Sequence, residues 1–236
     1  MNQLDFHFSK GKLNLFQFQI LEILLYKMFD QTVMTHICIP FTHDITLTSD
    51  NLMCPATTVH LNTAKKVLVF DMDETLTHSS YQPIENHLNS MVFNLNGINI
   101  YVYERPNASN LLYKLQKMFN LFIFTAGNKE YADPIISNFF SFVPEDHRLF
   151  RDSCRKENNK IYKDLYKFRR PMNEVIIVED CLDVIGFFPR NTIIIPSFQA
   201  TDDDNIFGEI LGPILEKCSK EDDVRPIIAQ NRIVTF

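Results

Sequence analysis

Short, unbroken apolar runs recur along the chain from residue 65 onwards, and segments with helical spacing lie between them. Runs of this kind, rich in β-branched and aromatic residues, are typical of strands that are buried on both faces of a parallel sheet. They are Val67–Phe70, Leu121–Phe124, Val175–Val178 and Thr192–Ile195. Because these strands alternate with helices, the pattern predicts an α/β fold, a parallel sheet with helices on both faces.

The segments between the strands predict three helices and one hairpin. Apolar residues at helical spacing predict helices after Pro106, after Gly127 and from about residue 205 to residue 218. An Asn-Gly pair at 96–97 separates two runs of alternating polarity, which is a strong signal for a two-residue β-hairpin. We therefore expect a small hairpin insert between the first two strands.

The first 64 residues lack this alternation and are predicted to form an N-terminal helix and an irregular extension. The helix covers residues 13–29, where polar residues interrupt an apolar run that is shorter than the roughly 20 residues needed to span a bilayer. We expect this helix to dock on a protein surface, and we expect neither membrane contact nor a secretory signal. The predicted domains are the extension at 1–64, a catalytic domain at 65–218 and a C-terminal tail at 219–236.

Charge and cysteine content narrow the class of protein. A net charge of −6 and a sequence pI near 5.6 give no general attraction for nucleic acid, so direct DNA or RNA binding is not expected. The five cysteines are odd in number and scattered, which indicates neither a disulfide framework nor a zinc site. An intracellular location is therefore expected, and no oligomeric state is predicted.

Two carboxylates follow the first strand directly, in the stretch Asp71–Thr75. In an extended chain Asp71 and Asp73 point to the same side, at the sheet edge where open α/β proteins bind ligands. One carboxylate can attack phosphorus and form a covalent intermediate, while the other protonates the leaving oxygen and later deprotonates water. Their repulsion favours a bound cation, and Mg²⁺ prefers oxygen ligands. The alternative is a solvated loop that caps a helix at Thr75, but the preceding buried strand favours the chemical interpretation.

The tips of two later strands carry further polar residues. Thr125 ends the second strand and could bind a phosphate oxygen, and Glu179 and Asp180 end the third and could bind the metal. Because parallel strands place their carboxyl ends at one edge of the sheet, these residues can converge with the two aspartates. Lys163 could neutralise the phosphoryl oxygens, although a lysine at such a position is most often a solvated surface residue.

Six motifs in this order resemble the haloacid dehalogenase (HAD) superfamily, and within it the small phosphatases of the RNA polymerase II C-terminal domain. They are Asp71–Ser80, Tyr103–Pro106, Phe122–Ala126 with Tyr131–Pro134, Leu149–Cys154, Tyr162–Leu165 and Val178–Asp180. The resemblance implies a Rossmann-like, HAD-type fold with a small β-hairpin insert and no large cap domain. It also implies Mg²⁺-dependent hydrolysis of phosphoserine or phosphothreonine in a protein substrate, and a nuclear or cytoplasmic location.

The resemblance further implies a role for each motif residue. The implied catalytic residues are Asp71 as nucleophile, Asp73 as general acid and base, Thr125 as phosphate-binding hydroxyl and Lys163 as balancing cation. The implied metal ligands are Asp71, the backbone carbonyl of Asp73 and Asp180, with Glu179 reaching the metal through water. Thr75 would orient the Asp73 loop, Ala126 would help to bind phosphate, and Arg151 would contact the phosphorylated substrate.

The chain departs from the family pattern at Glu179, where relatives usually carry Asp, and at Phe198, where a tryptophan is common. Residues 71 to 163 leave no room for a large cap, so we expect an open site that admits a side chain of a protein. Eight basic and three acidic residues between Arg151 and Arg170 could steer a phosphate, or could form an unrelated solvated face. Two other functions stay open: a noncatalytic docking module of the same fold, and a small-molecule phosphatase.

Overall fold

The computed structural model describes residues 61–231, apart from 86–88, 158–159, 182–187 and 202. The predicted N-terminal helix and almost all of the irregular extension lie outside the described residues.

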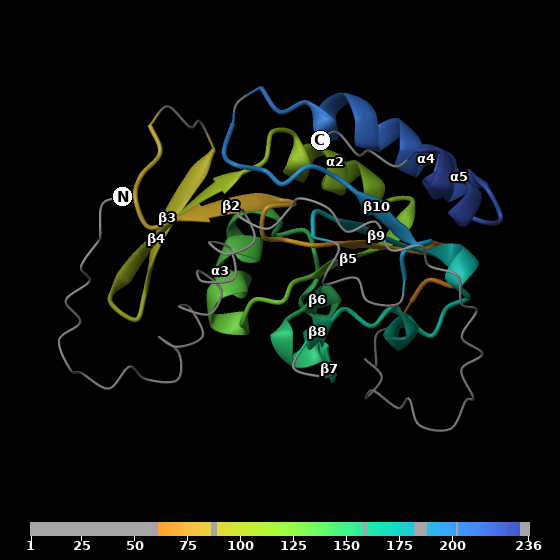
Figure 1. Cartoon of the computed structure of the whole chain (residues 1–236), viewed down its shortest axis with the longest axis horizontal. Helices are drawn as coiled ribbons and strands as arrows, with labels where there is room; N and C mark the ends of the chain where they lie inside the picture. Colours follow the sequence, from red (N-terminus) through yellow and green to blue (C-terminus); the bar gives the residue numbers. More distant parts are fainter. Residues whose placement is uncertain (1–60, 86–88, 158–159, 182–187, 202, 232–236) are drawn as a thin grey trace, which may run out of the picture. The chain divides into compact units, whose positions relative to one another are not determined.

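The central sheet has five parallel strands in the order β10-β9-β1-β5-β6 (Figure 1). The strands are β1 (Lys66–Phe70), β5 (Phe119–Phe124), β6 (Arg148–Leu149), β9 (Val175–Glu179) and β10 (Thr192–Ile194). The four predicted strands are confirmed, whereas β6 is too short to show a pattern in the sequence. Because β1 lies between β9 and β5, its carboxyl end is flanked by theirs.

The three predicted helices are also confirmed. The main helical segments are α2 (Ala108–Leu115), α3 (Lys129–Phe139), η3 (Leu165–Phe168), η6 (Ile206–Leu211), α4 (Gly212–Lys220) and α5 (Arg225–Gln230). Contacts join α2 to α4 and α4 to α5, and the three helices lie together on one side of the sheet (Figure 1). The last predicted helix begins as the π-helix η6 and becomes α-helical near Pro213, whose missing N–H suits the first turn of α4.

Both faces of β1 are buried, as the unbroken apolar run predicts. Successive side chains of a strand point to opposite faces, so Val67 and Val69 share one face and Phe70 lies on the other. Val67 and Val69 belong to a core cluster with Phe168 of the 3-10 helix η3. The Phe70 ring lies 5.9 Å from the ring of Phe207 in η6. The sheet is thus covered on one side by α2, α4, α5 and η6, and η3 packs against the other.

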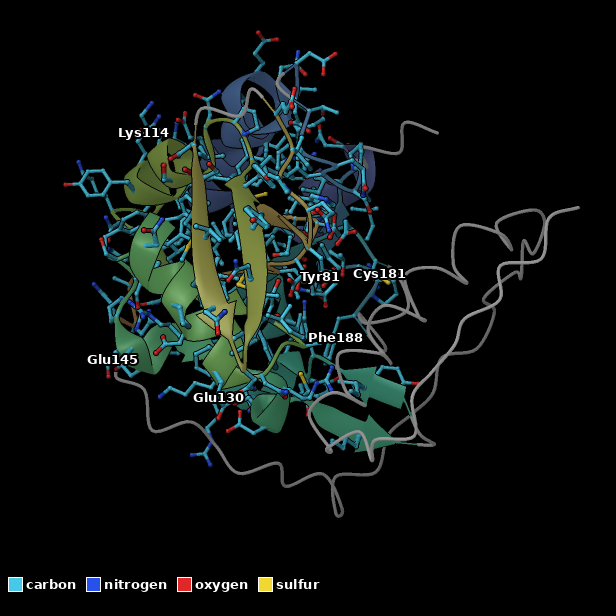
Figure 2. All side chains as sticks on the ribbon, turned by 90° about the vertical axis from the view of Figure 1, so that its left-hand side faces the viewer. Tyr81, Lys114, Glu130, Glu145, Cys181 and Phe188 are labelled. Carbon is cyan, nitrogen blue, oxygen red and sulfur yellow. The ribbon has the colours of Figure 1, made fainter. Side chains whose placement is uncertain are left out.

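A separate three-stranded antiparallel sheet forms the insert between β1 and β5. Its strands, in the order β2-β4-β3, are β2 (Thr77–Ser80), β3 (Ser90–Leu95) and β4 (Ile98–Glu104). The predicted hairpin is confirmed, and its turn residues Asn96 and Gly97 have φ angles of 52° and 85°, as a two-residue hairpin turn requires. Figure 2 shows the long strands of this sheet facing the viewer, with Glu130 of α3 near their lower end. Between residues 71 and 163 the described segments contain no larger insert.

Residues 219–231 contain helical structure where the sequence predicts a tail. Helix α4 continues to Lys220, and α5 follows with Ile227 and Ile228 buried. The sequence conceals this helix because it is only six residues long and offers a single apolar pair. Over the described ranges, no helix combines the length and the apolar composition that crossing a membrane requires.

Candidate active site

Two neighbouring strand tips hold the predicted nucleophile and the predicted phosphate-binding hydroxyl. The backbone N–H of Asp71 donates to the Val178 carbonyl oxygen at 3.0 Å, so the ladder between β1 and β9 extends to this residue. The backbone N–H of Thr125 donates to the Leu149 carbonyl oxygen at 2.9 Å and extends the ladder between β5 and β6 in the same way. The backbone of both residues is therefore hydrogen-bonded into the sheet, which holds their side chains in fixed positions.

Lys163 is a buried member of the site. It lies between η3 and β8 (Lys160–Tyr162), the second strand of a small hairpin that begins with β7 (Arg155–Glu157). Its side chain is only 1% exposed, and its ammonium group pairs with Asp71 and, at 2.6 Å, with Glu179. Burial lowers the pKa of Lys163, but the two carboxylates raise it more, so the net shift is upward. The lysine therefore stays charged, and the solvated-surface alternative is wrong.

Three carboxylates gather around this one ammonium group. Asp71, Glu179 and Asp180 each offer an oxygen within 4.8 Å of the others. Burial, followed by repulsion from Glu179, raises the pKa of Asp71 well above its usual value, and the same two causes raise the pKa of Asp180 to about 7. A divalent cation would offset the repulsion that raises both pKa values. Because every donor is an oxygen, the group fits a hard cation of the Mg²⁺ class.

Glu179 is held by the protein through both of its carboxylate oxygens. Oε2 accepts a hydrogen bond from Lys163, and Oε1 accepts the backbone N–H groups of Asp180 and Cys181, each at 3.2 Å. A carboxylate engaged in this way is less available to a metal than its neighbours are. The expectation that Glu179 reaches the metal through water stays a prediction that this arrangement favours.

Thr75 contacts the carboxylate group. Its hydroxyl donates to Asp180 Oδ1 at 3.2 Å rather than to a group of its own loop. Its carbonyl oxygen accepts from Arg105 at 3.2 Å, and the same fully buried guanidinium donates to the Pro196 carbonyl at 2.9 Å and to Asp204 at 2.7 Å. Arg105 therefore fixes the loop after β1 against the loop after β10.

Asp73 is half-buried, and two hydroxyl groups hold its carboxylate. Thr125 donates to Oδ2 at 3.0 Å, and Tyr131 donates to Oδ1 at 2.6 Å. Burial and the nearby Asp73 charge raise the pKa of Tyr131 well above its usual value, so the phenol keeps its proton. Helical spacing assigns Tyr131 only to one side of a helix, and the role of its hydroxyl is not visible in the sequence. Its place within the Tyr131–Pro134 motif is the one signal that points to it.

Arg151 lies beside the second strand tip, where its Nε donates to the Ala126 carbonyl oxygen at 2.6 Å. The basic run around it does not form a single solvated face. Lys163 and Lys167 are buried, and Arg170 pairs with Glu174. The steering surface suggested by the sequence is therefore smaller than the count of basic residues implies, although Arg151 itself remains next to the site.

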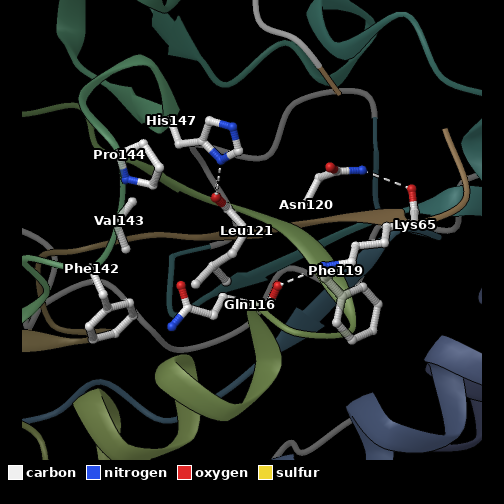
Figure 3. A pocket seen from close by; sticks show the side chains of 9 residues that line it. All are labelled: Lys65, Gln116, Phe119, Asn120, Leu121, Phe142, Val143, Pro144 and His147. Atoms are coloured by element: carbon white, nitrogen blue, oxygen red, sulfur yellow. Dashed lines mark hydrogen bonds between the residues drawn. The ribbon is translucent and has the colours of Figure 1, made fainter. Parts of the chain in front are cut away.

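A pocket also occurs at the opposite edge of the central sheet (Figure 3). Among the residues that line it are Lys65, which precedes β1, and Asn120 at the start of β5. His147 also lines it, and its Nδ1 donates to the Leu121 carbonyl oxygen at 2.7 Å. Lys65 and Asp71 lie at opposite ends of β1, and a strand rises about 3.3 Å per residue. The length of the strand therefore separates this pocket from the carboxylate site.

Comparison with known proteins identifies the family. The model of the NLI interacting factor-like phosphatases matches residues 66–225, which is more than half of the chain. The chain belongs to this family. The matched range contains every candidate site residue from Asp71 to Asp180, and the HAD-type fold inferred from the motifs is confirmed.

Curated relatives of the family cover most of the chain. A probable C-terminal domain small phosphatase of Dictyostelium discoideum is 33% identical over 77% of this chain and 59% of its own length. A human CTD small phosphatase-like protein is 35% identical over 73% of this chain and 62% of its own length. The match thus spans about three fifths of the length of each of these two relatives.

A solved structure shows a similar fold. The structure of Fcp1, an essential RNA polymerase II CTD phosphatase, has a TM-score of 0.50 and 20% identity, and the match covers 71% of this chain and 52% of Fcp1. At this identity the likeness concerns the fold alone.

Proposed function

We propose that this chain is a Mg²⁺-dependent protein serine/threonine phosphatase that acts through an aspartyl-phosphate on Asp71. The observation that carries the proposal is the pairing of Asp71 with the buried Lys163, beside a second carboxylate, Asp73, that two hydroxyl groups hold. A nucleophile, a fixed cation and an oriented acid and base are the parts that phosphoryl transfer through a carboxylate requires.

In the first step an Asp71 carboxylate oxygen attacks phosphorus, and the bond to the serine or threonine oxygen breaks. Asp73 gives its proton to that leaving oxygen, so the alcohol departs neutral. In the second step Asp73 takes a proton from water, the water oxygen attacks phosphorus, and Asp71 is released with inorganic phosphate. Lys163 holds Asp71 in place and balances its charge while the acyl phosphate forms and breaks.

The proposed metal ligands are Asp71, Asp180 and the backbone carbonyl of Asp73. When bound, Mg²⁺ supplies positive charge that offsets the negative charge of the phosphoryl oxygens. The close approach of the Asp71 and Asp180 carboxylates and the raised pKa values of both support a cation at this position.

We propose a phosphorylated protein segment as substrate, with peptides like the RNA polymerase II C-terminal domain as first candidates. Relatives are named CTD small phosphatases, and the described residues around the site form only a small insert sheet. An open site suits a side chain on an extended peptide better than a small metabolite that must be enclosed. The proposed phosphatase domain is residues 65–218, and the well-packed α5 extends the folded region beyond it.

A phosphate-release screen tests this proposal directly. Phosphoserine and phosphothreonine peptides are compared with small phosphorylated metabolites, each with Mg²⁺, with a chelator and with Ca²⁺, which prefers longer bonds and more ligands. We expect release from peptides with Mg²⁺ alone. Release from metabolites but not peptides would identify a small-molecule phosphatase, and peptide binding without release under every condition would identify a docking module.

A further inference from the structure

The Tyr131 hydroxyl connects the Asp73 carboxylate to the insert sheet. It lies 2.6 Å from Asp73 Oδ1 and 2.7 Å from the hydroxyl oxygen of Ser79 in β2. The Tyr131 hydroxyl donates to Asp73, and because a phenol has only one proton, Ser79 donates to Tyr131. The three groups form a directed chain that ends on the proposed acid and base.

The Thr125 hydroxyl cannot donate to Asp73 and to a phosphoryl oxygen at the same time. Its hydroxyl donates to Asp73 Oδ2 at 3.0 Å and accepts the Gly127 N–H at 2.8 Å. A hydroxyl has a single proton, so a phosphoryl oxygen bound at Thr125 competes with Asp73 for it. Once the Thr125 hydroxyl donates to a phosphoryl oxygen instead, Oδ2 of Asp73 is free to face the leaving oxygen, and among the described side chains Tyr131 still donates to the carboxyl group.

We propose that Tyr131 is a positioning residue that aims the Asp73 carboxyl at the leaving-group oxygen, and so enables the enzyme to expel the poor leaving groups of phosphoserine and phosphothreonine. This inference rests on the proposed function. Tyr131 acts only through Asp73. It keeps its own proton throughout the reaction and transfers none to the substrate.

The surroundings of Tyr131 give its hydroxyl a fixed position. Tyr131 lies in the first turn of α3, next to Glu130, which Figure 2 labels near the end of the insert strands. Its ring lies 6.4 Å from the ring of Phe93 in β3, and α3 and β3 are in contact. A Cβ at Gly127 would lie 3.1 Å from both Thr125 Oγ1 and Tyr131 Cδ1. A side chain at Gly127 would therefore crowd both hydroxyl-bearing side chains, which would have to shift by a few tenths of an ångström to make room.

Leaving groups of different basicity separate positioning from a merely structural role. Expulsion of an alkoxide needs protonation, whereas expulsion of p-nitrophenolate does not, because that anion is stable in water. We expect Tyr131→Phe to lower kcat/KM for a phosphoserine peptide by about 10- to 100-fold, which is the range for a misplaced catalytic group. For p-nitrophenyl phosphate we expect a loss of less than about 3-fold, since proton donation contributes little there. The ratio of the two kcat/KM values is the readout, because it reports steps up to formation of the phosphoenzyme.

Control variants keep the test decisive. Ser79→Ala removes the donor to the Tyr131 oxygen and should shift the ratio in the same direction by a smaller factor. Tyr113→Phe removes the hydroxyl of an exposed tyrosine on α2 and should leave the ratio unchanged. Circular dichroism and the melting temperature show whether each variant folds. If Tyr131→Phe does not fold, the ratio measured for Ser79→Ala decides the test.

The outcomes distinguish this inference from the proposed function. The positioning role alone is overturned if the wild type is active and the ratio of kcat/KM values is the same in Tyr131→Phe and Ser79→Ala as in the wild type. A variant that loses both activities by the same factor leaves the ratio unchanged and counts as this outcome. A wild-type chain inactive on both substrates overturns the proposed function and this inference with it.

Discussion

Replacing Asp71 with asparagine should abolish phosphopeptide hydrolysis while leaving the fold and peptide binding intact. An amide cannot form the covalent acyl phosphate, and loss of a nucleophile costs turnover on the order of 10⁴-fold or more. The fold should survive because the side chain keeps its shape and Lys163 keeps its 2.6 Å pair with Glu179. The raised pKa of Asp71 also means that its charge is disfavoured in the metal-free site, so removing that charge relieves repulsion.

Single-turnover phosphate release and fluorescence anisotropy with a labelled phosphopeptide measure the two parts of this prediction. Asp146→Asn is the matched control, because Asp146 is an exposed carboxylate in the 3-10 helix Glu145–His147, and it should retain full activity. Turnover by Asp71→Asn within tenfold of the wild type would contradict the nucleophilic role. Loss of peptide binding would show that the side chain serves recognition instead.

Replacing Lys163 with methionine should reduce both stability and turnover. The change leaves Asp71 and Glu179 buried without their cation, and breaking a buried pair in this way costs about 3–5 kcal/mol. Turnover should fall by about 10²–10³-fold, as it does when one electrostatic contact to the transition state is removed. Urea unfolding of the metal-free protein at neutral pH measures the stability loss.

The pH dependence identifies the cause of that loss. Burial raises the pKa of Asp71 above its value in the unfolded chain, and loss of the Lys163 charge raises it further, so the folded variant binds more protons and becomes more stable as the pH falls through the raised value. The deficit relative to wild type should therefore shrink between neutral pH and about pH 5. Addition of Glu179→Gln should restore part of the stability and none of the activity. Lys156→Met, at an exposed lysine in β7, should change neither, and a Lys163→Met protein as stable as the wild type would contradict the buried ion pair.

The parts of the fold that could be predicted are those in which one local pattern decides the structure. A strand buried on both faces must be apolar throughout, so β1, β5 and β9 are visible as unbroken runs, and the residues that follow them must meet at one sheet edge. The convergence of Asp71, Thr125 and Asp180 follows from this geometry.

Other features depend on contacts that no local pattern encodes. Lys163 lies on an irregular segment and differs from a surface lysine only in the carboxylates that surround it. The helical repeat predicts only the side of the helix on which Tyr131 lies, and it gives no sign that the Tyr131 hydroxyl has a hydrogen-bond partner. Strand β2 is the polar stretch THSS, which pairs with β4 although it has no alternation of its own. In each case a partner distant in the sequence determines the role.

The most direct test of the central claim is chemical trapping of the phosphoenzyme. The reaction with a phosphoserine peptide is quenched in acid during turnover, the protein is reduced with borohydride, and the digested protein is mapped by mass spectrometry. Reduction converts an aspartyl-phosphate to homoserine and leaves free carboxyl groups unchanged. We expect homoserine at position 71 and at no other aspartate. Unchanged Asp71 during demonstrated turnover, or homoserine at position 73 instead, would contradict it.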